Sequence, residues 1–350
     1  MRAGIGDLVR SMNCYYSNLI EGHNTHPVDI NSALAGDYAD DPRRRDLQRE
    51  AVAHIEVQRL IDRGEAPSPS LSRAFIEWTH RRFCENLPDD LLWVDDPRHG
   101  ALVKVIPGEL RGVPVRVGRH IVPDAAELPA YLARFEEAYR RRGLSKIEQI
   151  VAVAASHHRL LWIHPFLDGN GRVTRLASHA FLRELGIGSE LWSASRGLAR
   201  DVANYKAALM AADESRRGDL DGRGNLTNAG LREFCRFFLT VCLDQVRFME
   251  ELLEPTELTR RMEIWSEEQI RAKRLSKGSW PLLREAAISG EFERGKAASL
   301  TGYETRQART VLSQLLDRGL LVSVGPRDPV RLGFPIEVVE RRFPRLYPGL

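Results

Sequence analysis

The chain has 350 residues, with 51 lysines and arginines against 48 aspartates and glutamates and a formal net charge of +3. The length is sufficient for two or three packed units, and the balanced charge does not by itself indicate a polyanionic partner. No apolar run approaches the roughly 20 residues that span a bilayer, and the chain start lacks a signal-peptide pattern. We therefore expect a cytoplasmic protein with no membrane contact. The cysteines show no metal-binding or redox spacing, which favours reduced thiols.

Helical patterns dominate the first 90 residues. Apolar residues recur at three- and four-residue steps over 47–62 and 71–87, with Ser70 or Ser72 as a plausible N-cap of the second helix. Residues 100–123 instead alternate, are rich in β-branched side chains and are interrupted by glycine and proline. This pattern predicts a short hairpin or a pair of extended segments.

Helical patterns resume at 128–143 and at 147–163, and the second of these is the most apolar helix in the chain. His157 and His158 lie on this apolar helix, so we expect them to be packed or capping residues. Further helices are expected after the motif described below, around 202–217, and up to about residue 253. The loop 218–230 resembles a calcium loop only slightly, because its acceptors fall at the wrong spacing.

A separate module is expected from about residue 276. Three helical segments, the last two joined by a tight turn with a glycine, are followed by what look like two short strands around a Gly-Pro turn. This order predicts a winged helix. Arg306 and Arg309 on its recognition helix, and Arg327 and Arg331 on its wing, could meet DNA, although the module also carries many acidic residues. DNA binding, target selection and dimerisation stay open as alternatives.

The segment 164–175, HPFLDGNGRVTR, has the composition of an anion-binding site. Gly169, Asn170 and Gly171 permit a backbone that turns successive N–H groups toward one point, at the start of a helix. Arg172 and Arg175 are three residues apart, so they share a helix face and can grip consecutive phosphates.

Two further residues of the segment indicate chemistry as well as binding. Asp168 beside an anion site is reasonable if it holds a magnesium ion that bridges phosphates. A neutral His164, fixed by Pro165 and by a buried Phe166, could take a proton from an attacking hydroxyl. Together these residues predict an enzyme.

The segment resembles the signature of the Fic (filamentation induced by cAMP) family, HPFx(D/E)GNGRxxR, at every specified position, and the resemblance extends over roughly residues 10–250. It implies a mainly α fold, a helical bundle with a β-hairpin flap, here followed by the winged helix. It also implies transfer of AMP from ATP to a Ser, Thr or Tyr hydroxyl of a protein, with release of pyrophosphate.

The resemblance also implies a role for each motif residue. His164 would be the general base, Asp168 the Mg²⁺ ligand, and Asn170 with the Gly169 and Gly171 backbone would hold the α-phosphate region. Arg172 would contact the β-phosphate and Arg175 the γ-phosphate. Tyr205 matches the first position of a family Tyr-Tyr pair near the adenine, where the second is Lys206 here. The flap strand that covers the nucleotide and aligns the target would comprise Val115, Arg116, Val117 and Gly118.

Residues 15–23, YYSNLIEGH, resemble the family's inhibitory motif (S/T)xxxE(G/N), with Ser17, Glu21 and Gly22 in register. A carboxylate on Arg175 would occupy the arginine that the γ-phosphate needs, so we expect an autoinhibited enzyme.

Three functions are compatible with these residues. Protein AMP transfer leads; removal of AMP or transfer of another phosphate-containing group on the same site is the second, and a nucleotide-sensing winged-helix regulator is the third. The expected organisation is an N-terminal helical region (1–95), a catalytic core (96–253), and a linker helix with the winged helix (254–350). Expected partners are ATP, a target protein, and the chain itself through auto-modification or a homodimer.

Overall fold

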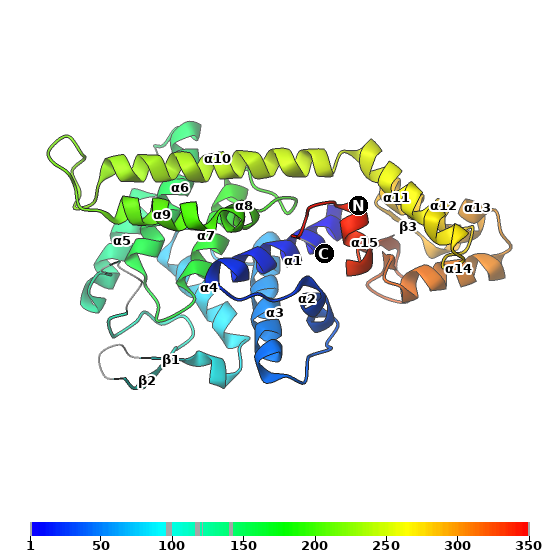
Figure 1. Ribbon diagram of the computed structural model, residues 1–350, viewed down its shortest axis with the longest axis horizontal. Helices are drawn as coiled ribbons and strands as arrows, with labels where there is room; N and C mark the ends of the chain where they lie inside the picture. The colour runs from blue at the N-terminus through cyan, green and yellow to red at the C-terminus, as the bar shows by residue number, and fades with distance from the viewer. Residues whose placement is uncertain (1, 96–99, 116–119, 121, 140–142, 349–350) are drawn as a thin grey trace. The chain divides into compact units, whose positions relative to one another are not determined.

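The computed structural model describes residues 2–95, 100–115, 120, 122–139 and 143–348, and it is predominantly helical (Figure 1). This confirms the expected mainly α class. The chain forms two compact units, one of residues 13–245 and one of the first twelve residues together with 246–350. That the first twelve residues belong with the C-terminal unit was not predicted. Among the described residues, no helix combines the length and the apolar composition needed to cross a membrane.

The unit 13–245 is a bundle of helices, two of which, the first and the last, also contribute residues to the other unit. They are α1 (Arg2–Glu21), α2 (Pro27–Leu34), α3 (Pro42–Asp62), α4 (Arg73–Glu85), α5 (Leu128–Ala138), α6 (Lys146–Ile163), α7 (Asn170–Glu184), α8 (Ala194–Arg200), α9 (Val202–Asp213) and α10 (Asn228–Leu252). Ser72 caps α4 by accepting from the Phe75 N–H, as predicted.

The core of this unit is built around α6 and α7, which pack against each other (Figure 1). The expected central helix is confirmed, because α6 buries most of its second half, including Val153, Ala154 and Leu160. Helix α4 packs on α7 and on α3, and α5 packs on α6. All four cysteines are buried free thiols, as the spacing predicted. The loop between α6 and α7 is therefore held by helices on several sides.

The expected hairpin or pair of extended segments over 100–123 is described only in part. The structure contains an antiparallel pair of β1 (Trp93–Asp95) with β2 (Leu102–Lys104), in which Val94 lies opposite Val103. Of these two strands β2 lies inside the expected range, and the described residues from 105 to 115 contain no strand. Val115 is half-buried outside any strand, and Arg116, Val117 and Gly118 lie outside the described residues. Glycine and proline interrupt this range, which leaves only short segments able to pair.

The second unit contains the three helices and two strands that were expected in its C-terminal part. Its elements are α11 (Pro255–Arg271), α12 (Ser279–Ser289), β3 (Glu291–Phe292), α13 (Ala297–Thr301), α14 (Thr305–Asp317), β4 (Leu321–Val322), β5 (Val330–Leu332) and α15 (Ile336–Arg342). The strands form an antiparallel sheet in the order β3-β5-β4. Arg331 on β5 forms an ion pair with Asp7, near the start of the chain, with 3.3 Å between Arg331 Nη2 and Asp7 Oδ2. The assignment of this module as a winged helix stays a prediction.

Candidate active site

The segment 164–175 forms the loop between α6 and α7 and the first turns of α7. His164 ends α6 in the left-handed region, with φ 50° and ψ 62°. Gly169, with φ 76°, takes the same conformation directly before Asn170 begins the 15-residue α7. One left-handed residue thus turns the chain at each end of the loop, and α7 begins directly after the second turn. A helix start of this kind favours an anion.

Asn170 closes this loop from the inside. Its side-chain oxygen accepts from the Phe166 N–H at 3.0 Å, and its amide nitrogen donates to the Phe166 carbonyl at 2.8 Å. Because the oxygen and the nitrogen of this side-chain amide both bond to the backbone of Phe166, Asn170 fixes the conformation of the loop. The ring of Phe166 is fully buried, as expected, and it stacks on His80 with ring centroids 3.9 Å apart.

His80 on α4 is a residue of the site that the sequence did not reveal. Its Nδ1 accepts from the Gly108 N–H at 2.9 Å, so the neutral ring carries its proton on Nε2. Burial lowers the pKa of His80 to about 4. A side-chain carbon built on Gly169 would lie 3.6 Å from the His80 ring, so the loop packs directly against this ring. His80 lies within an amphipathic helical pattern, where a histidine gives no distinctive signal.

His164 is neutral and contacts the Leu161 carbonyl through Nδ1. Burial lowers its pKa to about 4, so the imidazole is neutral at physiological pH. Nδ1 lies 3.4 Å from the Leu161 carbonyl. A proton on Nδ1 donated to that carbonyl leaves the lone pair on Nε2, which is the form that accepts a proton from a hydroxyl.

Arg111, the last residue of the segment PGELR (107–111), fixes the backbone beside His164. Its N–H donates to the Pro165 carbonyl at 2.9 Å, and its Nε donates to the His164 carbonyl at 2.8 Å. A terminal nitrogen donates to the Pro123 carbonyl at 2.6 Å. The side chain is buried and has no carboxylate partner in these contacts, so it acts through main-chain carbonyls. Arg111 therefore ties the loop to the segment that ends at Pro123.

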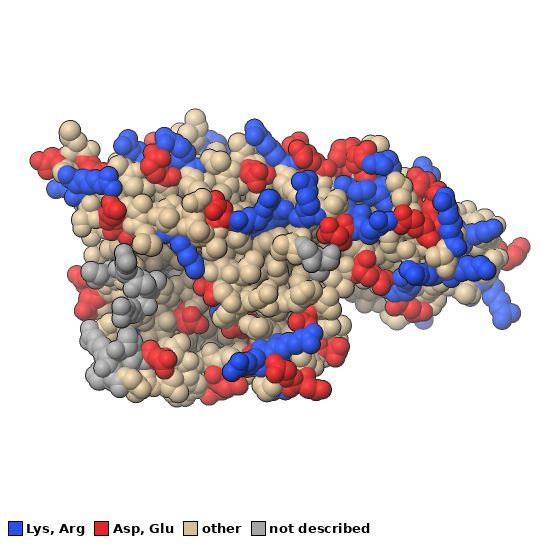
Figure 2. Space-filling view, viewed as in Figure 1, with Lys and Arg blue, Asp and Glu red and all other residues tan. Residues whose placement is uncertain are grey.

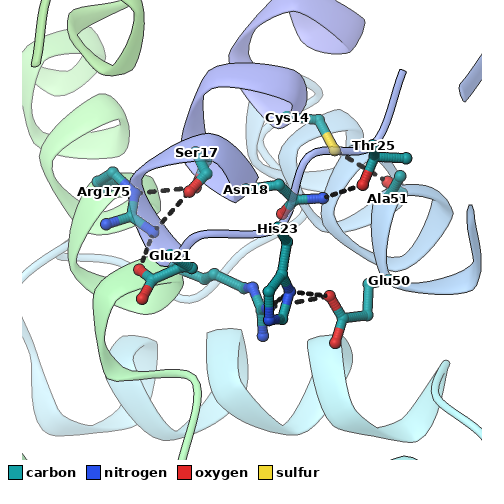
Figure 3. Close-up of polar contacts among 10 residues, drawn as sticks. Cys14, Ser17, Asn18, Glu21, His23, Thr25, Glu50, Ala51 and Arg175 are labelled. Carbon is teal, nitrogen blue, oxygen red and sulfur yellow. Dashed lines mark hydrogen bonds and ion pairs between the residues drawn. The ribbon is translucent and has the colours of Figure 1, made fainter. Parts of the chain in front are cut away.

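The expected contact between the N-terminal motif and Arg175 is present in the structure (Figure 3). Arg175 Nε donates to the Ser17 hydroxyl at 2.8 Å, and a terminal nitrogen donates to the Ser17 carbonyl at 3.3 Å and to the Glu21 carboxylate. Burial opposes the ionisation of Glu21, but the Arg175 and Arg172 guanidinium groups outweigh it and lower the pKa of this carboxyl. Gly22 follows with φ 89°, a conformation that suits glycine at the end of α1.

The Glu21 carboxylate lies against the start of α7 itself. A side-chain carbon built on Gly171 would be 2.1 Å from Glu21 Oε1 and 3.0 Å from an Arg175 nitrogen. An anion on the bare backbone of Gly171, at a helix start and beside Arg175, takes the position that the sequence assigned to phosphate. Glu21 is thus the anion that fills the cradle of Gly171, Arg175 and the α7 N-terminus in this structure.

Arg172 has partners that the sequence did not indicate. A terminal nitrogen donates to Glu50 Oε2 at 2.9 Å, and the guanidinium lies 5.0 Å from the centre of the Phe83 ring. His23 Nδ1 lies 2.8 Å from the same carboxylate oxygen. Glu50 is on α3, 122 residues away in sequence, so only the packing of the helices brings these groups together.

The remaining expected site residues have different surroundings. The Asp168 side chain is exposed, and no hydrogen bond or ion pair of its carboxylate is found among the described residues. Tyr205 is buried, and its hydroxyl donates to His157 Nε2 at 2.8 Å, while His157 Nδ1 donates to Ser178. Burial, partly offset by Arg175, raises the pKa of Tyr205. As expected, His157 and His158 are packed inside the bundle.

Part of the chain is similar to proteins of a known family. Residues 70–182 match the model of the Fic/DOC family. Protein adenylyltransferase Fic of Drosophila erecta is 28% identical over 172 residues, which make up 49% of this chain and 32% of that protein. The same-named protein of Drosophila grimshawi is 27% identical over 172 residues. The chain thus matches about a third of the length of these relatives.

The fold also has a solved counterpart. A Fic family protein from Desulfovibrio desulfuricans G20 superposes over 93% of this chain and 87% of its own length, with a TM-score of 0.53 at 17% sequence identity. The family match covers the loop and α4 but ends before Tyr205 and begins after Glu21.

Proposed function

The chain contains a Fic/DOC-family domain over residues 70–182, and from this premise we propose that it is a protein adenylyltransferase that moves AMP from ATP to a hydroxyl of a protein. The observation that carries the proposal is one short loop with two chemical functions. His164 at its beginning is neutral, and its Nε2 has no hydrogen bond among the described residues. At its end, the Glu21 carboxylate lies beside Gly171 and Arg175 at the start of α7. These relatives are named protein adenylyltransferases, which agrees with this assignment.

In the proposed reaction, ATP takes the place of the Glu21 carboxylate. The target hydroxyl gives its proton to His164 Nε2 while its oxygen bonds to the α-phosphorus. The bond from the α-phosphorus to the oxygen that bridges to the β-phosphate breaks, and pyrophosphate leaves with that electron pair. Arg172 and Arg175 hold the leaving phosphates, where charge develops. The target is a protein with an accessible Ser, Thr or Tyr, including a second copy of this chain.

Asp168 would hold Mg²⁺ in this scheme. Its carboxylate is exposed beside the cradle, and no group of three or more potential metal ligands is found among the described His, Cys, Asp and Glu residues. This fits Mg²⁺, which is commonly bound by one or two carboxylates with phosphates and water supplying the other ligands. The ion would supply charge neutralisation for the phosphates.

We further propose that the resting enzyme is inhibited by Glu21. The carboxylate fills the cradle and holds Arg175, so the γ-phosphate has neither its arginine nor its space. Arg175 is buried, and a charge-assisted hydrogen bond of this kind is stronger than one between neutral groups. Displacement of α1 residues 17–21, or loss of the Glu21 carboxylate, would open the site.

Purified Glu21→Gly protein, incubated separately with ATP labelled at the α-phosphate and at the γ-phosphate, tests the proposed reaction. AMP transfer predicts protein-bound label from the α position only, and none in a Glu21→Gly/His164→Ala double variant. Label from the γ position would instead identify a kinase. Protein-bound label in the double variant would show that His164 is not the base.

For the C-terminal module, exposed arginines favour DNA as a second partner. Arg306 and Arg309 are exposed on α14, with no ion pair or hydrogen bond of their side chains among the described residues, whereas Arg331 is paired with Asp7. On the face shown in Figure 2, basic and acidic residues are otherwise interspersed. DNA binding by the full chain predicts a salt-dependent gel shift that Arg306→Glu/Arg309→Glu removes. A shift that both proteins share would reject α14 as the DNA-contacting helix.

A further inference from the structure

The guanidinium of Arg172 is almost completely enclosed. The residue is 4% exposed, with the Phe83 ring on one side and the Glu50 carboxylate at a terminal nitrogen. Glu50 is itself largely covered, with 12% of its side chain exposed. The Glu50–Arg172 pair differs from the Glu21–Arg175 pair, because Glu50 belongs to α3, outside the N-terminal inhibitory motif, and is separated from Glu21 by α2.

One donor of this arginine has no acceptor. Arg172 Nε is buried and makes no hydrogen bond within the described part of the chain. A buried N–H of a charged group without a partner costs free energy, so such a donor calls for an explanation. Arg172 lies one residue after Gly171, and the Glu21 carboxylate occupies the space where a side chain on Gly171 would lie. A phosphate oxygen beside the cradle is an acceptor of the right charge for this N–H.

The Glu50 carboxylate is shared with the inhibitory segment. His23, directly after Gly22, places Nδ1 2.8 Å from Glu50 Oε2, and Figure 3 draws this contact. The same nitrogen lies 3.0 Å from an Arg172 nitrogen. A carboxylate oxygen only accepts, so a hydrogen bond at the shorter distance requires the proton on His23 Nδ1. Arg172 then has no acceptor on His23, and its only strong partner among these groups is Glu50.

We propose that Glu50 is a positioning residue for phosphate recognition. It anchors one end of the Arg172 guanidinium and leaves the Nε–H edge for the β-phosphate of a nucleotide. This inference rests on the proposed function for the identity of the ligand, and it adds a residue on α3 to the site. Without Glu50, the guanidinium loses its orientation, and phosphate binding loses the fixed geometry that makes a single N–H effective.

The test compares two nucleotides that differ by the phosphate in question. Binding of AMP and of ADP, each with Mg²⁺, is measured by calorimetry in the Glu21→Gly background, where the cradle is free. We expect Glu50→Ala to weaken ADP binding about tenfold or more, or about 1.4 kcal/mol, while AMP binding changes less than about twofold. Glu50→Gln, which keeps an acceptor oxygen without the charge, should fall between the two.

Glu56→Ala is the matched control, because Glu56 is on the same helix and forms a local ion pair with Arg59, three residues on. It should bind both nucleotides as the parent does. An equal loss of AMP and ADP binding in Glu50→Ala and Glu50→Gln would reduce Glu50 to a structural role and overturn the inference. Unchanged ADP binding would also overturn it. Since binding is read without catalysis, failure of AMP transfer leaves this test intact.

Discussion

The Glu21 carboxylate and the bare backbone of Gly171 occupy adjoining space: a side-chain carbon on Gly171 would lie 2.1 Å from Glu21 Oε1. Gly171 is inside α7, where its φ does not require glycine, so the reason for this residue is the anion beside it. The same close approach that admits the carboxylate would admit a phosphate. In the proposed mechanism, catalysis and inhibition would therefore compete for one position on the backbone.

The substitution Gly171→Ala tests this relationship between the carboxylate and the backbone. The added methyl group fills the cradle, so ATP binding should weaken about tenfold or more even in the Glu21→Gly background, where inhibition is already removed. Calorimetry with ATP measures this. Gly224→Ala is the control, because a side chain there would meet only one atom, at 4.0 Å. Equal ATP affinity of Gly171→Ala and the parent would show that phosphate binds elsewhere.

Ser17→Ala should weaken the inhibitory contact without removing its charge. The variant loses the hydrogen bond from Arg175 Nε at 2.8 Å, and a hydrogen bond to a charged group contributes about 1.5–3 kcal/mol. Basal AMP transfer from α-labelled ATP should rise, but less than in Glu21→Gly. A rate equal to that of the wild type would mean that Ser17 does not contribute to inhibition.

Arg111→Ala should impair catalysis by loosening the loop. Its side chain holds the carbonyls of His164 and Pro123, and a displacement of about 1 Å at a reacting group can cost about 100-fold in rate. We expect a large fall in kcat in the Glu21→Gly background, with Arg111→Lys in between. Transfer within twofold of the parent in a folded Arg111→Ala protein would remove Arg111 from the site.

Acid should destabilise the fold between pH 6.5 and pH 4. Burial lowers the pKa of His80 to about 4 and of His54 to about 3, from an ordinary value of 6.5. In this window the unfolded chain binds protons that the folded chain does not, so stability falls as pH falls. For His80 alone this amounts to about 3 kcal/mol.

Urea unfolding at several pH values measures this loss. His80→Gln should flatten the pH dependence of the free energy of unfolding, whereas substitution of the exposed His26 by Asn should leave it unchanged. A free energy of unfolding that stays constant from pH 6.5 to pH 4 would contradict buried, neutral histidines at these positions.

The features that the sequence predicted are those whose physical cause is local. The loop chemistry of residues 164–175 is contained in twelve consecutive residues, and α3, α4 and α6 follow from apolar residues at helical spacing. Ser72 could be identified because a cap is read from the residues next to it. The Glu21–Arg175 contact was expected from a family resemblance, and the structure contains it.

The features that the sequence did not predict depend on packing between distant segments. Glu50 reaches Arg172, and His80 reaches Phe166, because α3 and α4 pack near α7. No spacing along the chain encodes these pairs. The pairing of the strands is a related case: β2 pairs with Trp93–Asp95, which lies upstream of the alternating range. Short strands are specified by their partners more than by their own pattern.

The central claim is that Glu21 inhibits AMP transfer by occupying the cradle at Gly171 and Arg175. One rate tests this claim most directly. Initial transfer of label from α-labelled ATP to protein is measured for wild type, Glu21→Gly and Glu21→Gly/Arg175→Ala. We predict a rate in Glu21→Gly at least about tenfold above wild type, because the carboxylate no longer competes with ATP for Arg175. A tenfold change corresponds to about 1.4 kcal/mol. The added Arg175→Ala change should abolish this gain. A folded Glu21→Gly protein with a rate no higher than wild type would contradict the account.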